Sequence, residues 1–220
     1  MRGFSAFTAL RVPSRKTQVS RRWHVVKIPN MSDDYVIRAV RGDEWEKVKE
    51  LRLAALRDPA AAVAFLETEE RALAQADEYW QQRAAGAAEG RGARQFIAEA
   101  ADGRWVGSVT VLIEAQGGSD FFGEPIEQQQ GHVVGVFVRP EQRGSGLVER
   151  LFDAGLDWAW SLEAPATERV RLFVHEDNAR AERFYRRYGF EPSGLLIPLE
   201  TGAKEREYVY VRPAGPGASG

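Results

Sequence analysis

The sequence contains no cysteine, which excludes disulfide bonds, zinc sites built from thiolates and a cysteine nucleophile. That absence suits a cytoplasmic protein, because disulfides are rare in the cytosol. No apolar run approaches the roughly 18 residues that a transmembrane helix needs, so we expect no membrane-spanning segment. The 220 residues suffice for one sizeable domain or two small ones.

Acidic residues are missing from the first 30 positions, which hold seven arginines and lysines. Because the whole chain has a net charge of −2, residues 31–220 carry −9. A net-acidic body argues against general nucleic-acid binding, which depends on basic surfaces. It mildly favours a cationic ligand such as an amine.

The basic N-terminal segment, residues 1–32, is predicted to be a poorly ordered extension. Its composition resembles an organelle transit peptide. The alternative, which we favour, is an upstream start codon, because Met31 is followed within a few residues by a strand pattern. We expect a single domain over residues 33–213 and a flexible tail over 214–220.

The first part of this domain alternates strand and helix patterns. Residues 35–40 read as a strand, and Asp43 is a plausible N-cap for a helix that Pro59 ends. A second helical pattern covers 67–83, and the small, glycine-rich stretch 84–94 reads as a loop.

Hairpins and crossover helices follow, which calls for a mixed sheet flanked by helices. The pair Asp102-Gly103 is typical of a β-hairpin turn. The long polar loop 116–131 contains Phe121 and Phe122, for which we expect one of three roles: capping a pocket, contacting a partner chain or packing against the domain. The expected strands are 94–100, 104–115, 132–138, 169–174, 190–199 and 204–211, with helices at 146–162 and from Asn178.

Arg143, Gly144 and Gly146 stand together in the stretch VRPEQRGSGL, where a strand pattern gives way to an amphipathic helix pattern. A helix N-terminus attracts anions, and glycines let the backbone approach a phosphate closely. The P-loop lysine and the third glycine of the dinucleotide fingerprint are both missing. The stretch therefore predicts a different kind of diphosphate site, and the alternative is a flexible helix start.

The stretch NARAERFYRRYGF follows the next strand. Asn178 is a good N-cap, and Gly189 is a natural residue after a helix C-terminus. At 100° per residue, Asn178 and Tyr185 share one face of the helix.

Together the two stretches resemble the GNAT superfamily of acetyl-CoA-dependent N-acetyltransferases, whose signatures are R-x-x-G-x-G/A and N-x-x-A-x-x-x-Y-x-x-x-G-F. The matching residues are Arg143, Gly146 and Val148 in the first stretch, and Asn178, Ala181, Tyr185, Gly189 and Phe190 in the second. Val148 departs from the usual Gly or Ala. Its side chain either weakens cofactor binding or points into the core.

The resemblance implies an α/β (α+β) fold with a mixed, mostly antiparallel central sheet. Strands ending at Val138 and Val174 would splay apart around acetyl-CoA, the co-substrate, and no metal is implied. The implied cofactor-binding residues are Val136, Phe137, Val138, Arg143, Gly144, Ser145, Gly146, Leu147, Val148 and Asn178.

The resemblance also implies that Tyr185 is the general acid that protonates the leaving thiolate. The alternative is a buried packing residue. The base that takes the amine proton is left open among His132, His175, Glu114 and an ordered water.

The implied acceptor is the primary amine of a small molecule. A protein N-terminus, a lysine, or a regulatory domain that binds CoA without turnover are the alternatives. Residues 43–85 and 116–131 are expected to choose the acceptor. A homodimer is common in this family, and the sequence indicates no surface for it.

Overall fold

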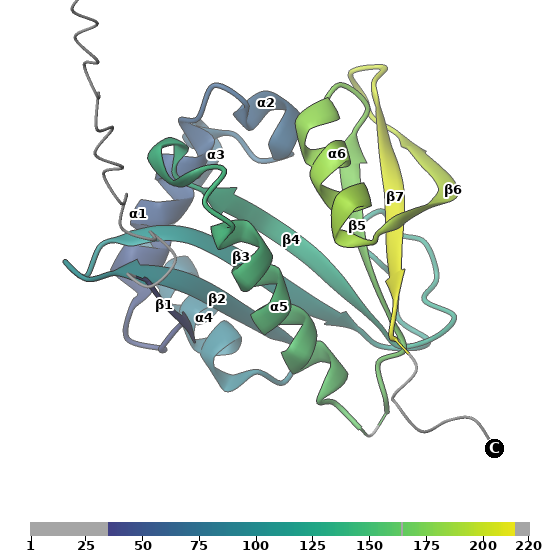
Figure 1. Cartoon of the computed structure of the whole chain (residues 1–220), viewed down its shortest axis with the longest axis horizontal. Helices are drawn as coiled ribbons and strands as arrows, with labels where there is room; N and C mark the ends of the chain where they lie inside the picture. Colours follow the sequence, from purple (N-terminus) through teal and green to yellow (C-terminus); the bar gives the residue numbers. More distant parts are fainter. Residues whose placement is uncertain (1–34, 164, 214–220) are drawn as a thin grey trace, which may run out of the picture. The chain divides into compact units, whose positions relative to one another are not determined.

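The computed structural model describes residues 35–163 and 165–213 (Figure 1). The expectations for residues 1–32 and 214–220 lie outside this range, and the domain limits remain a prediction. Seven strands form one sheet in the order β1-β2-β3-β4-β5-β7-β6. Only β4 and β5 are parallel neighbours, so the expected mixed, mostly antiparallel sheet is confirmed.

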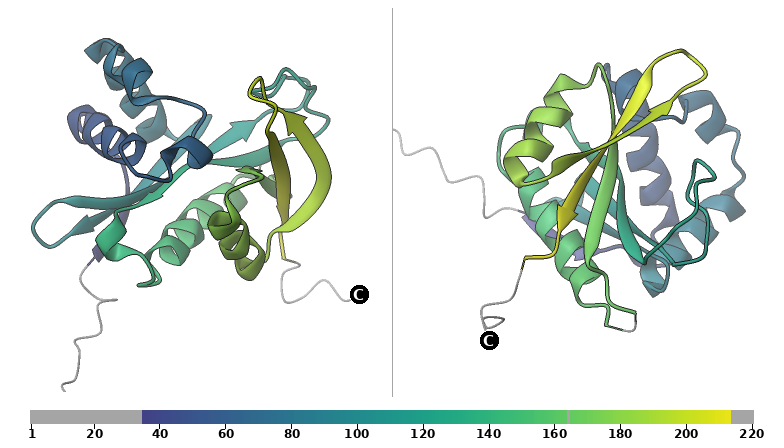
Figure 2. Two further views of the ribbon diagram at one scale, coloured as in Figure 1. Left: turned by 90° about the horizontal axis from the view of Figure 1, so that it is seen from above. Right: turned by 90° about the vertical axis from the view of Figure 1, so that its right-hand side faces the viewer.

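The described strands are β1 Tyr35–Ala39, β2 Ala93–Ala100, β3 Trp105–Glu114, β4 Gln130–Val138, β5 Arg169–His175, β6 Glu191–Pro198 and β7 Lys204–Val211. The described helices are α1 Trp45–Leu56, α2 Ala61–Ala64, α3 Glu69–Leu73, α4 Asp77–Glu89, α5 Leu147–Trp160 and α6 Ala179–Tyr188, with a single 3₁₀ turn at Pro140–Gln142. Helices α1 to α4 lie on one side of the sheet, and α5 and α6 lie on the other (Figure 2).

Two hydrophobic cores fill these layers. Beneath α5, Leu151 and Phe152 belong to a cluster with Val111 of β3. A Cβ added at Gly155 would be 3.1 Å from Val111, so this glycine allows α5 to lie close to the sheet. The second core, beneath α1 and α4, contains Val48, Leu51, Trp80 and Ile97. Each fully buried side chain of this size contributes about 1.5–3 kcal/mol.

The helical region before β2 differs from the sequence-based expectation. The pattern expected as one helix over 67–83 is divided into α3 and α4, and residues 84–89, expected in a loop, are helical. The small residues of this stretch suggested a loop, but Ala84 and Ala87 are buried with Trp80 at helical spacing. The helix ends at Gly90, whose φ of 68° is the left-handed C-cap conformation.

The start of α1 also differs, because the N-cap position is Glu44 and not Asp43. The Glu44 carboxylate accepts hydrogen bonds from the Arg38 side chain at 2.6 Å and from the N–H of Arg41 at 2.8 Å. This ion pair fixes the β1–α1 turn. The Asp102-Gly103 hairpin, the Asn178 cap and the Gly189 terminus are confirmed.

Candidate functional site

Strands β4 and β5 are paired only at their first residues and then diverge. Gly131 faces Val170 and His132 faces Arg171, and no pair follows (Figure 1). A cleft of about 920 Å³, a size typical of ligand sites, is lined by both strands beyond that point. The expected splayed strands are therefore present.

A β-bulge interrupts β4 where this strand lines the cleft. Thr110 of β3 faces Val134 and Ser108 faces Phe137, so two residues of β4 lie opposite one. Gly135 has a φ of 63°, which favours glycine. After the bulge, the cofactor candidates Val136, Phe137 and Val138 line the cleft along an edge of β4 that no strand covers.

The turn before α5 presents free backbone donors. Gly144 and Gly146 have φ values of 82° and 83°, a backbone conformation that residues other than glycine rarely adopt. Within the described residues, the N–H groups of residues 144–148 donate no hydrogen bond, and the space where a Cβ of Gly146 would project is open. Five free N–H groups at a helix N-terminus suit a diphosphate.

Val148 and Ser145 complete this turn. Val148 lines the cleft, as Leu147 does, but it also packs against the core beneath α5. Part of its side chain therefore occupies the protein interior and not the cleft. The Ser145 hydroxyl donates to the carbonyl of Gln142 at 2.7 Å, which leaves its N–H as the group available to a ligand.

The Arg143 side chain, an expected phosphate ligand, lines the cleft and also has two partners within the protein. Its guanidinium pairs with Asp58 and donates to the carbonyl of Val138 at 3.1 Å. The Asp58 side chain is only 5% exposed, and a buried carboxylate needs a cation. Arg143 therefore lines the cleft while joining the end of α1 to the glycine turn.

Asn178 is likewise occupied by the protein. Its side-chain oxygen caps α6 by accepting from the N–H of Ala181 at 3.2 Å, as the sequence predicted. Its amide nitrogen donates to the carbonyl of Val63 in α2 at 3.1 Å. To contact a cofactor arm through its amide nitrogen, Asn178 would give up its hydrogen bond to Val63, which connects α2 with α6.

Tyr185 lies on α6 and lines the cleft, although it is only 8% exposed. Its ring packs among Phe152, Phe184 and Phe190. The hydroxyl makes no hydrogen bond with any described residue. Burial raises the pKa of this phenol, and the charge of Glu205 raises it further. The hydroxyl therefore holds its proton firmly.

Glu114 and His132, two of the candidate bases, are partners. Nδ1 of His132 lies 2.8 Å from a Glu114 oxygen, and Arg171 binds both oxygens of that carboxylate. Burial opposes ionisation, but the hydrogen bonds from His132 and Arg171 outweigh it and lower the pKa of Glu114 to about 2. An acid this strong is a poor base. Because the carboxylate only accepts, His132 Nδ1 is the donor, and Nε2 is left as the acceptor of the neutral ring.

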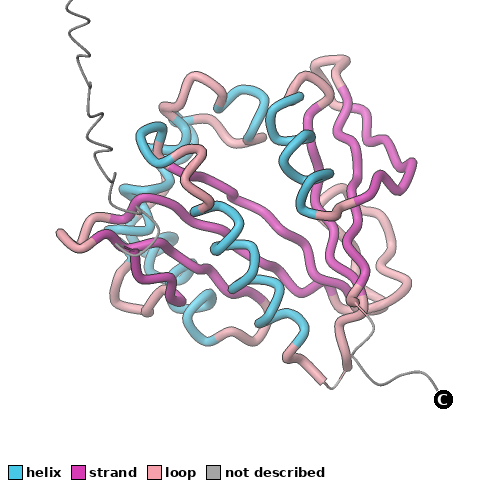
Figure 3. Tube along the Cα trace, in the orientation of Figure 1, coloured by secondary structure: helices cyan, strands magenta, loops and turns pink. Residues whose placement is uncertain are grey.

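The same guanidinium holds the loop between β3 and β4, which is neither helix nor strand (Figure 3). Arg171 donates to Asp120 at 2.9 Å, and this carboxylate is 1% exposed. Asp120 in turn accepts from the N–H of Phe122, whose ring packs on Phe173. Phe121 and Phe122 both line the cleft, which supports the capping alternative.

Glu205 of β7 is a functional candidate that the sequence did not reveal. It lies opposite His175 across the β5–β7 ladder and lines the cleft. Its side chain is buried, with no hydrogen bond or ion pair to any described residue, and burial raises its pKa to about 7. His175 accepts from the N–H of Asp177 at 3.2 Å through Nδ1. Only the fold brings Glu205 close enough to influence Tyr185.

Residues 35–163 and 165–213 also bear on a possible metal site and a possible membrane-spanning helix. No group of three or more histidine, aspartate and glutamate side chains is arranged there to hold a metal ion. Among the same residues, no helix has the length and apolar character needed to cross a bilayer.

Comparisons with known proteins find relatives in sequence and in fold. Mycothiol acetyltransferase from Saccharomonospora viridis is 38% identical over 96 residues, which are 44% of this chain and only 29% of that protein. The acetyltransferase of the GNAT family from Streptococcus pneumoniae has a TM-score of 0.61 at 14% identity, covering 81% of this chain and 100% of that one. The PaiA N-acetyltransferase from Thermoplasma acidophilum, in complex with coenzyme A, has a TM-score of 0.55 at 16% identity, covering 80% and 99%.

The family comparison extends over both signature stretches. The model of the acetyltransferase (GNAT) family matches residues 45–190, which is more than half of the chain. The range runs from the start of α1 to Phe190 and includes the glycine turn and Tyr185. The chain therefore belongs to the GNAT family of acetyltransferases.

Proposed function

We propose that this protein transfers the acetyl group of acetyl-CoA to the primary amine of a small molecule. Acetyl-CoA supplies the acetyl thioester. The observation that supports the proposal most directly is that the Tyr185 phenol and the Glu205 carboxyl, both without a hydrogen-bond partner among the described residues, line one cleft beside the glycine turn. The curated relative is also named for a small molecule, mycothiol.

The fold supports the following binding roles. The N–H groups of residues 144–148 hold the diphosphate, and the uncovered edge of Val136–Val138 lies along the cofactor arm as a strand would. Asn178 exchanges its bond to Val63 for a contact with the arm. Arg143 contributes to this site by fixing the position of the glycine turn through its ion pair with Asp58.

The proton roles belong to Tyr185 and Glu205. As the carbon–nitrogen bond forms and the carbon–sulfur bond breaks, Tyr185 gives its proton to the sulfur and Glu205 takes one from the amine. A carboxyl with a pKa of about 7 is well matched to act as a base near neutral pH. We favour Glu205 over His132 because its charge already acts on Tyr185.

Thiol release from acetyl-CoA, measured with a panel of small amines and peptides, tests this function. We expect turnover with small amines. Turnover with peptides alone would favour a protein acceptor. Tight CoA binding without any thiol release would favour a regulatory domain.

The pH profile tests the base. For the wild type, kcat/KM should rise with pH through about 7 as Glu205 loses its proton. The Glu205→Gln variant should lose this rise, whereas His132→Gln should keep it. The opposite result would assign the base to His132.

A further inference from the structure

The cleft is positively charged although residues 31–220 are net acidic. Seven arginines line it, against four carboxylates. Asp58, Glu67 and Glu149 are each paired with an arginine, so the lining retains an excess of positive charge. A cleft with an excess of arginine side chains attracts an anionic ligand.

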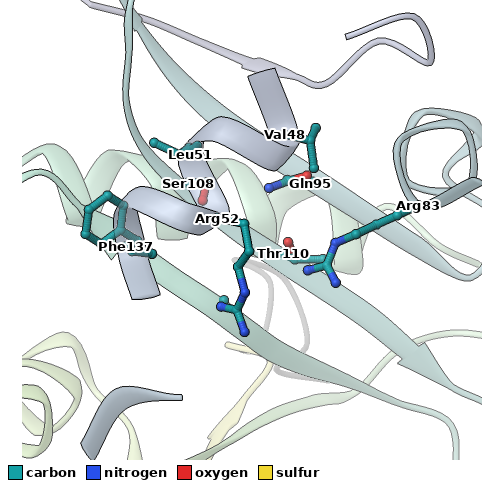
Figure 4. A pocket seen from close by; sticks show the side chains of 10 residues that line it. Val48, Leu51, Arg52, Arg83, Gln95, Ser108, Thr110 and Phe137 are labelled. Atoms are coloured by element: carbon teal, nitrogen blue, oxygen red, sulfur yellow. The ribbon is translucent and has the colours of Figure 1, made fainter. Parts of the chain in front are cut away.

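Two of these arginines project from α1 and α4, on the side of the sheet away from α5 (Figure 4). Arg52 pairs with Glu67 at 2.8 Å and lies over the ring of Phe65. Arg83 donates only to the Tyr79 hydroxyl at 3.2 Å, and no described carboxylate pairs with it. Burial lowers the pKa of Arg52, and the nearby charge of Arg83 lowers it further.

Unpartnered polar side chains lie beneath the two guanidinium groups. Gln95, Ser108 and Thr110 are each more than nine-tenths buried, and their side chains make no hydrogen bond with any described residue. With Arg52 and Arg83 they line a small cavity of about 10 Å³, which has room for about one water molecule (Figure 4). These amide and hydroxyl groups line the cavity without a partner among the described residues, so the cluster is suited to a polar occupant.

The cluster adjoins the bulge of β4. Arg52, Arg83, Gly135 and Phe137 line both the small cavity and the large cleft. A Cβ added at Gly135 would be 3.8 Å from the Thr110 hydroxyl. A ligand bound here would therefore lie beside the strand segment that we assign to the acetyl-bearing arm.

We propose that the acceptor amine carries an anionic oxygen group, a carboxylate or a phosphate, which Arg83 binds with Arg52 and the Thr110 hydroxyl. This inference rests on the proposed function and specifies its substrate class. Guanidinium forks match both groups in a bidentate manner. Glu67 balances Arg52, so Arg83 contributes the uncompensated charge. An acceptor without an anionic group would leave the Arg83 charge without a carboxylate or phosphate partner among the described residues.

Matched acceptors test the inference. Thiol release is measured with the standard amino acids against their amides, and with O-phosphoethanolamine against ethanolamine. We expect the anionic member of at least one pair to have a kcat/KM at least about tenfold higher. The pair that shows the difference identifies the group. Equal values for both members of every active pair would overturn the inference.

Variants locate the effect. Arg83→Gln should raise the KM for the anionic acceptor about 10- to 100-fold and leave acetyl-CoA affinity and the KM of a neutral amine unchanged. Arg83→Lys should recover part of the loss, because it keeps the charge but not the fork. Arg91→Gln is the matched control, because Arg91 is exposed outside the cleft and pairs with Glu89. An unchanged KM in Arg83→Gln would contradict the site.

A binding measurement separates this inference from the proposed function. Calorimetry with the N-acetylated form of each anionic amine, in the presence of CoA, should detect binding that Arg83→Gln weakens by the same factor. Absence of turnover with every amine would contradict the proposed function alone. Absence of binding by every anionic compound would contradict the anion site.

Discussion

On the α5 side of the cleft, the groups that we assign to the ligand are backbone N–H groups from five consecutive residues, 144–148. On the α1–α4 side they are side chains from elements far apart in the chain, including Arg52, Arg83, Thr110 and Glu205. The first side depends on one backbone conformation. The second depends on the entire sheet being in register.

This difference determines how each side tolerates change. A backbone site accepts new side chains wherever they point away from the ligand, but not a new conformation at Gly144 or Gly146. A side-chain site accepts backbone adjustment but loses a contact with every substitution. Evolution of a new acceptor is therefore expected on the α1–α4 side.

The largest expected effect is on stability, from the buried charges of the acceptor side. Arg171→Met leaves Glu114, Asp120 and Glu207 without their shared cation, so the free energy of unfolding should fall by about 3–5 kcal/mol. Urea denaturation measures the loss.

The exposed pair of Arg91 with Glu89 provides the control, since Arg91 is 83% exposed. Arg91→Met should change the free energy of unfolding by less than about 1 kcal/mol. A loss below about 1 kcal/mol in Arg171→Met as well would mean that the three carboxylates are adequately hydrated.

The next effect is on turnover, where the two sides meet. Tyr185→Phe removes the proton donor and should lower kcat by about 100-fold with little change in the KM for acetyl-CoA. Tyr210→Phe is matched, because Tyr210 belongs to the same aromatic cluster but does not line the cleft. Unaltered turnover in Tyr185→Phe would remove the phenol from the mechanism.

A third prediction concerns the backbone side alone. Gly146→Val places a side chain in a left-handed conformation and over the free N–H groups, so acetyl-CoA affinity should fall by about 10- to 100-fold. Calorimetry checks the dissociation constant. Gly202→Val, with a φ of 86° and similarly open surroundings outside the cleft, introduces the same strain and should leave the affinity unchanged. Equal losses in both would indicate strain rather than blocked donors.

The smallest effect is a pH dependence of stability. Burial raises the pKa of Glu205 from 4.5 to about 7, so the folded state keeps a proton that the unfolded state loses between these values. The wild type should therefore lose up to about 2.5 kcal/mol as pH rises from 5 to 8, relative to Glu205→Gln. Thermal unfolding of both proteins at the two pH values measures this difference. A constant difference would mean that water enters the cleft and keeps Glu205 ionised.

Local signals predicted the backbone side well. The Asn178 cap, the Gly189 terminus and the glycines of the α5 turn depend on neighbours within a few residues, so their patterns are visible in the chain. The splayed strands were implied by the GNAT resemblance and are present. The separation of α3 from α4 was missed, because no glycine or proline marks residues 74–76.

Long-range partners account for what the sequence could not indicate. Glu205 is separated from Tyr185 by 20 positions and one complete hairpin, and only the β5–β7 register turns it toward the cleft. The pairing of Arg143 with Asp58, 85 positions earlier, has no local signal in the sequence. No spacing rule relates Arg52 and Arg83, which lie on separate helices.

The short connection after α1 has a consequence for protein engineering. Asp58, in this connection, and Val63, in the adjoining helix α2, are the partners of Arg143 and Asn178. A designer who rebuilds this segment to admit a bulkier amine would also loosen the nucleotide side, so the two affinities would change together. Arg83 contacts neither partner, and mutagenesis at that position offers a way to retarget the acceptor while the nucleotide affinity stays constant.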